Sequence, residues 1–276
     1  GSAMKINKFL TPYNLNRLGD ANRIKYIVIH YVGATGGAEA NCRYYASKYI
    51  GASAHYYVGF DGEIWQSVED GDIAWHCGAK SYRHPKCRNS NSIGIELCVR
   101  NKGSQAADSR DWYFEDATVQ AAIELTRELM EKYGIPAERV IRHYDVTGKI
   151  CPNPYVYNHT QHTWEAFKAA LVEPKEYPQG FIQASDGVRW WYQFKDGSYA
   201  RNGWYWLTEV TGGTSGWYLF DTEGYMLTGY QTDPAGERFF LCPDSGVHEG
   251  QCMVTDGRGV LKIVGEYDFK EHKYMI

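Results

Sequence analysis

The chain of 276 residues lacks several features that assign a protein to a class at once. No apolar run approaches the ~20 residues that a membrane helix needs, so we expect no membrane insertion. The formal net charge is −4 and no basic block stands out, so we expect no nucleic-acid partner. The short zinc motifs Cys-x-x-Cys and His-Glu-x-x-His are also absent, so no local pattern by itself fixes a metal site.

The seven cysteines are too few and too scattered for a disulfide scaffold, and their number is odd. At least one thiol must therefore be free, reactive or metal-bound. After Met4 there is no apolar segment of the 7–15 residues typical of a secretory signal, and residues 1–3 resemble an expression remnant. We expect synthesis in the cytoplasm without a signal peptide; the alternative is that a signal was removed.

Alternating strand and helix patterns fill residues 1–172 and predict one α/β domain, a mixed central sheet flanked by helices. Asp61-Gly62 is a hairpin signal, and 140–143 is expected to run into a loop. Strands are predicted at 25–30, 55–60, 63–66, 92–99 and 140–143, and helices at 38–49, 115–133 and 163–172.

The pattern changes after residue 172. Residues 173–182 are polar and contain two prolines, which predicts a linker to a second domain over 183–276. There the helical periodicity is lost, and five of the nine tryptophans lie in repeated units. Each unit has an aromatic strand, an Asp/Gly turn and a second strand. Since a single hairpin cannot bury a face, we expect an all-β, solenoid-like stack of hairpin repeats.

Three residues of the first domain are candidate metal ligands. His30 ends a predicted strand, and His143 and Cys151 follow another. Two histidines and one cysteine are an attested zinc set that leaves a position open for water, and the thiolate favours zinc. Spacing alone leaves a second interpretation open, in which a strand-end histidine, a surface histidine and a buried cysteine hold no metal.

The run from His143 to Cys151, His-Tyr-Asp-Val-Thr-Gly-Lys-Ile-Cys, resembles the second metal motif of the zinc N-acetylmuramoyl-L-alanine amidases. The strand that ends at His30 resembles their first metal motif. Between these two, segments 53–58 and 74–78 resemble the family's substrate-groove motifs, and segment 92–96 is similar to the strand that carries a glutamate in many members. The resemblance implies a Zn²⁺ cofactor held by the three candidates. It also implies hydrolysis of the amide between N-acetylmuramic acid and the L-alanine of bacterial peptidoglycan stem peptides.

The same resemblance implies roles for residues around the metal. Glu96, on the strand face opposite the apolar one, is expected to transfer protons, and Lys149 to stabilise the oxyanion. Some phage members carry a catalytic tyrosine where Ala54 stands here, so the proton transfer is assigned to Glu96. The expected substrate contacts are His55, Trp75 and His76.

Residues 216–230 resemble a choline-binding, cell-wall-anchoring repeat, in which aromatic rings from adjacent hairpins surround a quaternary ammonium. The resemblance implies a choline-bearing wall glycopolymer as partner. A different glycopolymer is left open, as is the interpretation that the rings are only the core of the repeats. The candidate cage residues are Trp191, Trp204, Trp217, Tyr218 and Tyr230.

These resemblances together imply a modular cell-wall lysin that acts at the bacterial wall. The lack of a visible signal favours a phage or prophage endolysin released through a membrane lesion. One alternative is a host autolysin whose signal was removed. Another is a peptidoglycan-binding protein without activity, but relatives of that kind have lost the cysteine ligand, whereas Cys151 is retained here.

Overall fold

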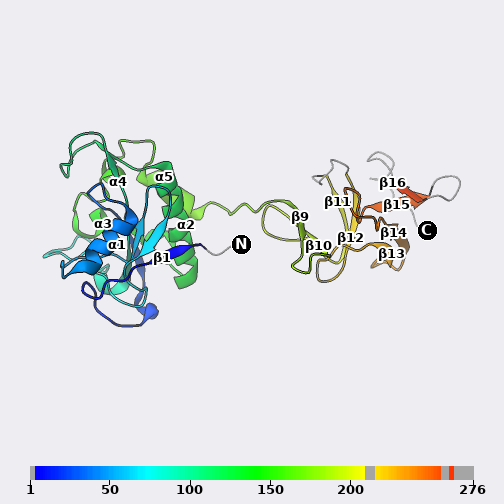
Figure 1. The fold of residues 1–276 in the computed structure, drawn as a ribbon, viewed down its shortest axis with the longest axis horizontal. Helices are drawn as coiled ribbons and strands as arrows, with labels where there is room; N and C mark the ends of the chain where they lie inside the picture. Colours follow the sequence, from blue (N-terminus) through cyan, green and yellow to red (C-terminus); the bar gives the residue numbers. More distant parts are fainter. Residues whose placement is uncertain (1–3, 209–214, 256–260, 264–276) are drawn as a thin grey trace. The chain divides into compact units, whose positions relative to one another are not determined.

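The structure, a computed structural model, describes residues 4–208, 215–255 and 261–263. The chain divides into two compact units, Gly1–Glu173 and Pro174–Ile276 (Figure 1). Among the helices of these described ranges, none combines the length and the apolar character required of a transmembrane span.

A six-stranded mixed sheet forms the centre of the first unit. Its strands are β1 (Ile6–Lys8), β2 (Tyr26–Tyr31), β3 (Tyr56–Val58), β4 (Ile64–Gln66), β5 (Ser92–Leu97) and β8 (Val140–Arg142). The order is β1-β4-β3-β5-β2-β8, so that β2 lies between the parallel strands β5 and β8. The antiparallel pair β3–β4 is the hairpin predicted at Asp61-Gly62. A separate two-stranded ribbon joins β6 (Arg100–Asn101) and β7 (Trp112–Tyr113).

The α-helices of this unit are α1 (Ala38–Ser47), α2 (Asp116–Tyr133), α3 (His143–Thr147), α4 (Asn153–Tyr157) and α5 (Trp164–Val172). Short 3₁₀ turns lie at Ala21–Arg23, Asn89–Asn91 and Ala137–Arg139. The three predicted helices are confirmed, and α2 ends at Gly134 in the left-handed conformation, with φ 65°. The prediction of a loop after β8 is wrong, because α3 begins there. The Asp145 carboxylate accepts the backbone N–H of Arg142 at 2.9 Å and so stabilises the start of the helix.

Strand alternation divides the sheet's side chains between two cores. Ile29 and Ile95 pack in the larger one, with Leu125 of α2. Val28 packs instead in a smaller cluster that includes a residue of α3. Since successive side chains of a strand point to opposite faces, His30 shares the face of Val28, away from α2. The sheet therefore presents His30 on the face where its polar partners gather.

The second unit is all β, as predicted, but its strand pairing differs from the expected hairpins. The strands are β9 (Gly180–Gln183), β10 (Trp190–Gln193), β11 (Gly203–Leu207), β12 (Gly216–Phe220), β13 (Gly229–Thr232), β14 (Arg238–Leu241), β15 (Cys252–Thr255) and β16 (Leu261–Ile263). Antiparallel pairs join β9 to β10, β11 to β12, and β13 through β16 in order.

The main ladders thus form between successive predicted units. The end of one unit, β11, pairs with the aromatic strand of the next, β12. Within a unit, the strand after the Asp/Gly turn is reduced to single bridges, such as Gln193 to Tyr199. The predicted linker at 173–182 is also shorter than expected, because α5 ends at Val172 and β9 begins at Gly180.

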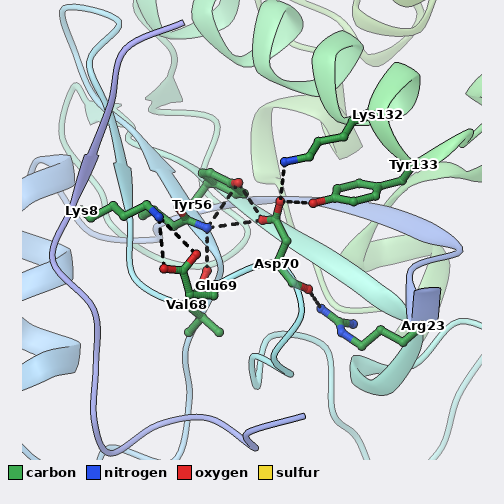
Figure 2. Close-up of polar contacts among 9 residues, drawn as sticks. Lys8, Arg23, Tyr56, Val68, Glu69, Asp70, Lys132 and Tyr133 are labelled. Atoms are coloured by element: carbon green, nitrogen blue, oxygen red, sulfur yellow. Dashed lines mark hydrogen bonds and ion pairs between the residues drawn. The ribbon is translucent and has the colours of Figure 1, made fainter. Parts of the chain in front are cut away.

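A partly buried carboxylate, Asp70, ties α2 to the loop after β4, as Figure 2 shows. Asp70 accepts the phenol protons of Tyr56, at 2.6 Å, and of Tyr133 at the end of α2. Burial, together with Asp70, raises the pKa of both phenols above their usual range, so both remain donors. Arg23 donates to the backbone carbonyl of the same residue at 2.7 Å. Asp70 therefore fixes one corner of the sheet against the main helix.

We predict that Asp70→Ala destabilises the first unit by about 2 kcal/mol, because the buried phenol of Tyr56 and the partly buried phenol of Tyr133 lose their shared acceptor. The measurement is the free energy of unfolding in urea. Glu69→Gln is the matched control, since the neighbouring Lys8–Glu69 ion pair is exposed and worth less than about 1 kcal/mol. Equal losses in the two variants would contradict the role assigned to Asp70.

Candidate metal centre

The parallel register of β2 and β8 brings the two histidines together. Ile29 of β2 pairs with Arg142, the last residue of β8, so His30 and the first residue of α3, His143, follow this pair on neighbouring segments. Their Nδ1 atoms lie 3.1 Å apart, and Cys151 Sγ lies 3.6 Å from Nδ1 of His30. All three side chains are buried, and their donor atoms lie within 4.8 Å of one another. The structure thus groups the three predicted ligands at one point.

The loop that carries the cysteine is folded back on α3. The backbone N–H of Tyr144 donates to the carbonyl of Cys151 at 2.9 Å, and α3 closes at Gly148 in the left-handed conformation, with φ 87°. Arg142, at the start of the helix, pairs with Asp145 at 2.8 Å. Both ends of the segment between the second and third ligands are therefore fixed.

The electrostatics of this cluster fit a cation. Burial and the neighbouring histidine lower the pKa of His30 well below its usual range, and burial and Lys149 lower that of His143 to about 3. Both rings are therefore neutral and carry lone pairs. Burial raises the pKa of the Cys151 thiol, so its thiolate needs a compensating positive charge. Two imidazoles and a sulfur match the donor set of zinc, and a bound Zn²⁺ would supply that charge.

Glu96 lies beside the cluster, because β5 pairs with β2 in the register that sets it opposite His30. Its Oε2 atom is buried and accepts no hydrogen bond from the described part of the chain. Burial raises the pKa of Glu96 to about 8, and the positive charge of Lys149 opposes this shift. Lys149 itself is exposed, on the loop between the second and third ligands. The structure thus brings both residues predicted to be catalytic to the candidate centre.

Two of the three expected substrate contacts have other roles. His55 is 0% exposed; its Nδ1 accepts the backbone N–H of Gly94 at 3.0 Å, and its Nε2 lies 2.9 Å from the carbonyl of Asp72. The prediction that His55 contacts substrate is therefore wrong, because both ring nitrogens hold backbone. His76 is also buried, and its Nδ1 lies 2.9 Å from Nε2 of His30. It supports a ligand instead of facing outward.

Trp75 keeps an accessible side chain. Its indole N–H donates to the side chain of Asn16 at 2.8 Å, and its ring contacts Tyr49, which is 71% exposed. Of the three expected contacts, only Trp75 stays a candidate for touching substrate. Tyr49 was missed by the sequence analysis, since a single tyrosine after a helix gives no signal of an aromatic neighbour.

The five candidate cage residues of the second unit do not all pack in one cluster. Trp204 and Trp217 pack against Leu219, whereas Tyr218 is buried in a different cluster. Tyr230 is 60% exposed and contacts Phe240. The candidates therefore do not all share one cluster, and a cage built from three or four of them stays a prediction.

A cavity of about 660 Å³ lies elsewhere in that unit. It is lined by Phe181, Gln183, Gly187, Val188, Trp190, Tyr218, Met226, Ser245, Gly246, Val247 and Glu249. Only Tyr218 belongs to the predicted set. Trp190 was passed over in favour of its neighbour Trp191, because the sequence does not show which side of β10 faces a cavity.

A family model described as N-acetylmuramoyl-L-alanine amidase matches residues 20–154. The chain is 33% identical over 171 residues to the N-acetylmuramoyl-L-alanine amidase CwlL of Bacillus licheniformis, which covers 58% of this chain and 43% of CwlL. It is 30% identical over 190 residues to the N-acetylmuramoyl-L-alanine amidase CwlH of Bacillus subtilis (strain 168), which covers 66% of this chain and 70% of CwlH. The chain therefore spans less than half the length of CwlL.

Among solved structures, a mutant endolysin from Bacillus subtilis is 29% identical, with a TM-score of 0.48. That match covers 61% of this chain and 99% of the endolysin chain.

We predict that Glu96→Gln stabilises chelator-treated protein at pH 8 but not at pH 4. An acid whose pKa is about 8 when folded and 4.5 when unfolded costs stability progressively as pH rises between these values. The gain at pH 8 is on the order of 3 kcal/mol. Urea unfolding of both proteins at the two pH values measures it. Glu128→Gln, on the exposed side of α2, is the control, and an equal gain there would contradict the assignment.

Proposed function

The chain belongs to the N-acetylmuramoyl-L-alanine amidase family, and from this premise we propose that it is a zinc-dependent peptidoglycan hydrolase. The bond cleaved is the amide between the lactyl group of N-acetylmuramic acid and L-alanine of the stem peptide. The observation that carries the proposal is the buried cluster of His30, His143 and Cys151, with the carboxyl group of Glu96 on the adjoining strand. The proposed partner is bacterial peptidoglycan, and the proposed site of action is the bacterial cell wall.

In this mechanism His30, His143 and Cys151 hold the metal. When bound, zinc supplies Lewis acidity that polarises the scissile carbonyl and lowers the pKa of water. Glu96 accepts one proton from the attacking water as the new C–O bond forms. It returns that proton to the nitrogen of L-alanine as the C–N bond breaks. Burial raises the pKa of Glu96 to about 8 in the chain without a metal, and a bound cation would lower it toward the range that suits a group that both takes and gives a proton.

Lys149 is the proposed oxyanion partner. Its ammonium group is the only side-chain cation among the causes that shift the pKa of Glu96, and it also lowers that of His143. A positive charge near these two groups would stabilise the negative oxygen that develops on the carbonyl during attack. Trp75 is the proposed contact to substrate beyond the reacting groups.

We predict that zinc chelation or Cys151→Ser lowers the rate of amide cleavage at least about 100-fold, because either change removes metal-derived stabilisation of the transition state. Added Zn²⁺ restores the chelated enzyme. Mass spectrometry of digested peptidoglycan measures release of peptides with a free L-alanine amine. Cys42→Ser, a buried thiol of α1 outside the cluster, is the control and keeps its activity.

Folded Cys151→Ser protein that cleaves as fast as wild type would contradict the mechanism. Wild-type protein that binds peptidoglycan but releases no such peptides would instead be a recognition protein without activity. Phage or host origin does not alter either result.

The second unit is proposed to anchor the enzyme to a choline-bearing wall glycopolymer. The aromatic rings of Phe181 and Trp190, with the carboxyl group of Glu249, line one cavity. Aromatic faces and a carboxylate both attract a quaternary ammonium. Of the five candidate cage residues named from the sequence, only Tyr218 lines this cavity, so the proposal is supported by a different set of rings. Endolysin action at the wall would gain residence time from such an anchor.

We predict that Trp190→Ala weakens choline binding about 5- to 10-fold, because one cation–π contact is worth about 1 kcal/mol. Calorimetric titration of the full chain with choline chloride measures it. Tyr230→Ala is the matched control: that ring is exposed and lies outside the cavity, so its loss leaves binding unchanged. Weaker choline binding by Tyr230→Ala, with unchanged binding by Trp190→Ala, would favour the candidate cage residues over the cavity. A wild-type chain that does not bind choline would contradict choline as the ligand.

A further inference from the structure

We infer that His76 and Ser92 are positioning residues that fix the tautomer of His30 and so prepare it to bind the metal. The three side chains form one buried hydrogen-bonded relay. His30 Nε2 lies 2.9 Å from His76 Nδ1, and His76 Nε2 lies 2.9 Å from Ser92 Oγ. The inference rests on the proposed zinc site, but it concerns only how these residues of the chain orient the first ligand.

The direction of each hydrogen bond follows from the far end of the relay. The Ser92 hydroxyl donates its only proton to the carbonyl of Arg88, at 2.7 Å. Its oxygen therefore accepts from Nε2–H of His76. Because a neutral imidazole carries one proton, His76 Nδ1 is then an acceptor, and it takes the proton of His30 Nε2–H.

This order leaves the lone pair of His30 on Nδ1. That atom is the one that faces the other ligands, 3.1 Å from His143 Nδ1 and 3.6 Å from Cys151 Sγ. The alternative tautomer would carry a proton on Nδ1 and could not bind a metal there. The relay thus selects the tautomer that the cluster needs, and it does so from outside the cluster.

The surrounding chain holds the middle ring in place from two sides. The side-chain oxygen of Asn89 accepts the backbone N–H groups of His76, at 3.1 Å, and of Cys77, at 2.8 Å. On the other side, β5 has a glycine, Gly94, where any larger residue would collide: a Cβ there would lie 2.5 Å from Cγ of His76. His76 is 8% exposed and Ser92 0%. The ring is therefore confined, with its two nitrogens facing His30 and Ser92.

Groups that hold the second nitrogen of a metal-binding histidine commonly change metal affinity 10- to 100-fold when they are removed. We expect Ser92→Ala to weaken zinc binding by about tenfold and His76→Phe by up to about 100-fold. The first variant removes the group that sets the direction of the relay, and the second removes the acceptor of His30 Nε2–H.

The experiment is competition for zinc between the full-length protein and a chromogenic chelator, with folding checked by circular dichroism. Ser47→Ala is the matched control, because that hydroxyl also donates to a backbone carbonyl, Tyr44, but contacts no histidine. Wild-type zinc affinity in folded Ser92→Ala and His76→Phe proteins would overturn the inference. Weaker binding in both, with Ser47→Ala unchanged, supports it.

A second measurement does not depend on how the variants fold. The ¹⁵N shifts of imidazole nitrogens distinguish the two neutral tautomers, and in chelator-treated wild-type protein we expect His30 to carry its proton on Nε2. A proton on Nδ1 would overturn the inference. Zinc affinity is measured without peptidoglycan, so a chain that binds zinc through this relay yet cleaves no muramyl amide would refute the proposed function alone.

Discussion

The candidate centre depends on one constraint, the parallel register of β2 between β5 and β8. Pairing of Ile29 with Arg142 and of His30 with Glu96 sets two ligands and the carboxyl group at the same edge of the sheet. Because side chains alternate between faces, a slip of one residue would turn His30 into the apolar core below α2. The register is held by that core: Ile27 and Ile29 fill it, and only their alternation leaves His30 on the polar face. Packing on one side of the sheet thus decides the chemistry on the other.

That arrangement is unfavourable for the protein without a metal. The cluster holds a buried thiol and two histidines whose pKa values are lowered, and on the adjoining strand the Oε2 atom of Glu96 is buried without a hydrogen bond from the described part of the chain. Buried polar groups cost free energy unless they are paired. A cation at the three ligands would offset most of this cost, since it pairs the thiolate and lies near Glu96. A single bound ion would then affect both stability and activity. Without the ion, the rest of the fold must be stable enough to offset the cost of these buried groups. Asp70 and Arg23, at the corner of the sheet shown in Figure 2, contribute to that firmness.

The sequence predicted which residues gather at the candidate metal centre better than it predicted the residues that support them. His30 lies at the end of a predicted strand, and His143 and Cys151 belong to one contiguous motif, so the sequence alone could indicate all three. The helices 115–133 and 163–172 could be predicted because their apolar pattern or their flanking residues are local features of the sequence. The roles of His55 and His76 could not be found in this way. Whether a histidine beside aromatics faces solvent or a ligand depends on contacts made by residues far along the chain, such as Ser92 and Gly94. In the second unit the Asp/Gly turns were local and correct. The pairing of β11 with β12 was not predictable, because repeated aromatic strands offer several partners of similar pattern.

The aromatic composition of the second unit has a structural explanation that limits its functional one. Two-stranded ribbons bury little surface, so large rings must supply their cores. Trp206 and Trp217 pack edge to face at 5.6 Å, and the indole N–H of Trp204 donates to the buried carboxylate of Asp233 at 3.0 Å. Rings packed in this way are partly buried, so less of their surface is open to a ligand. The number of tryptophans and tyrosines in such repeats therefore overstates the number of binding sites, and a ring is a candidate only where it also borders a cavity. By that criterion Trp190 is a better candidate than Trp204 or Trp217, which do not line the cavity.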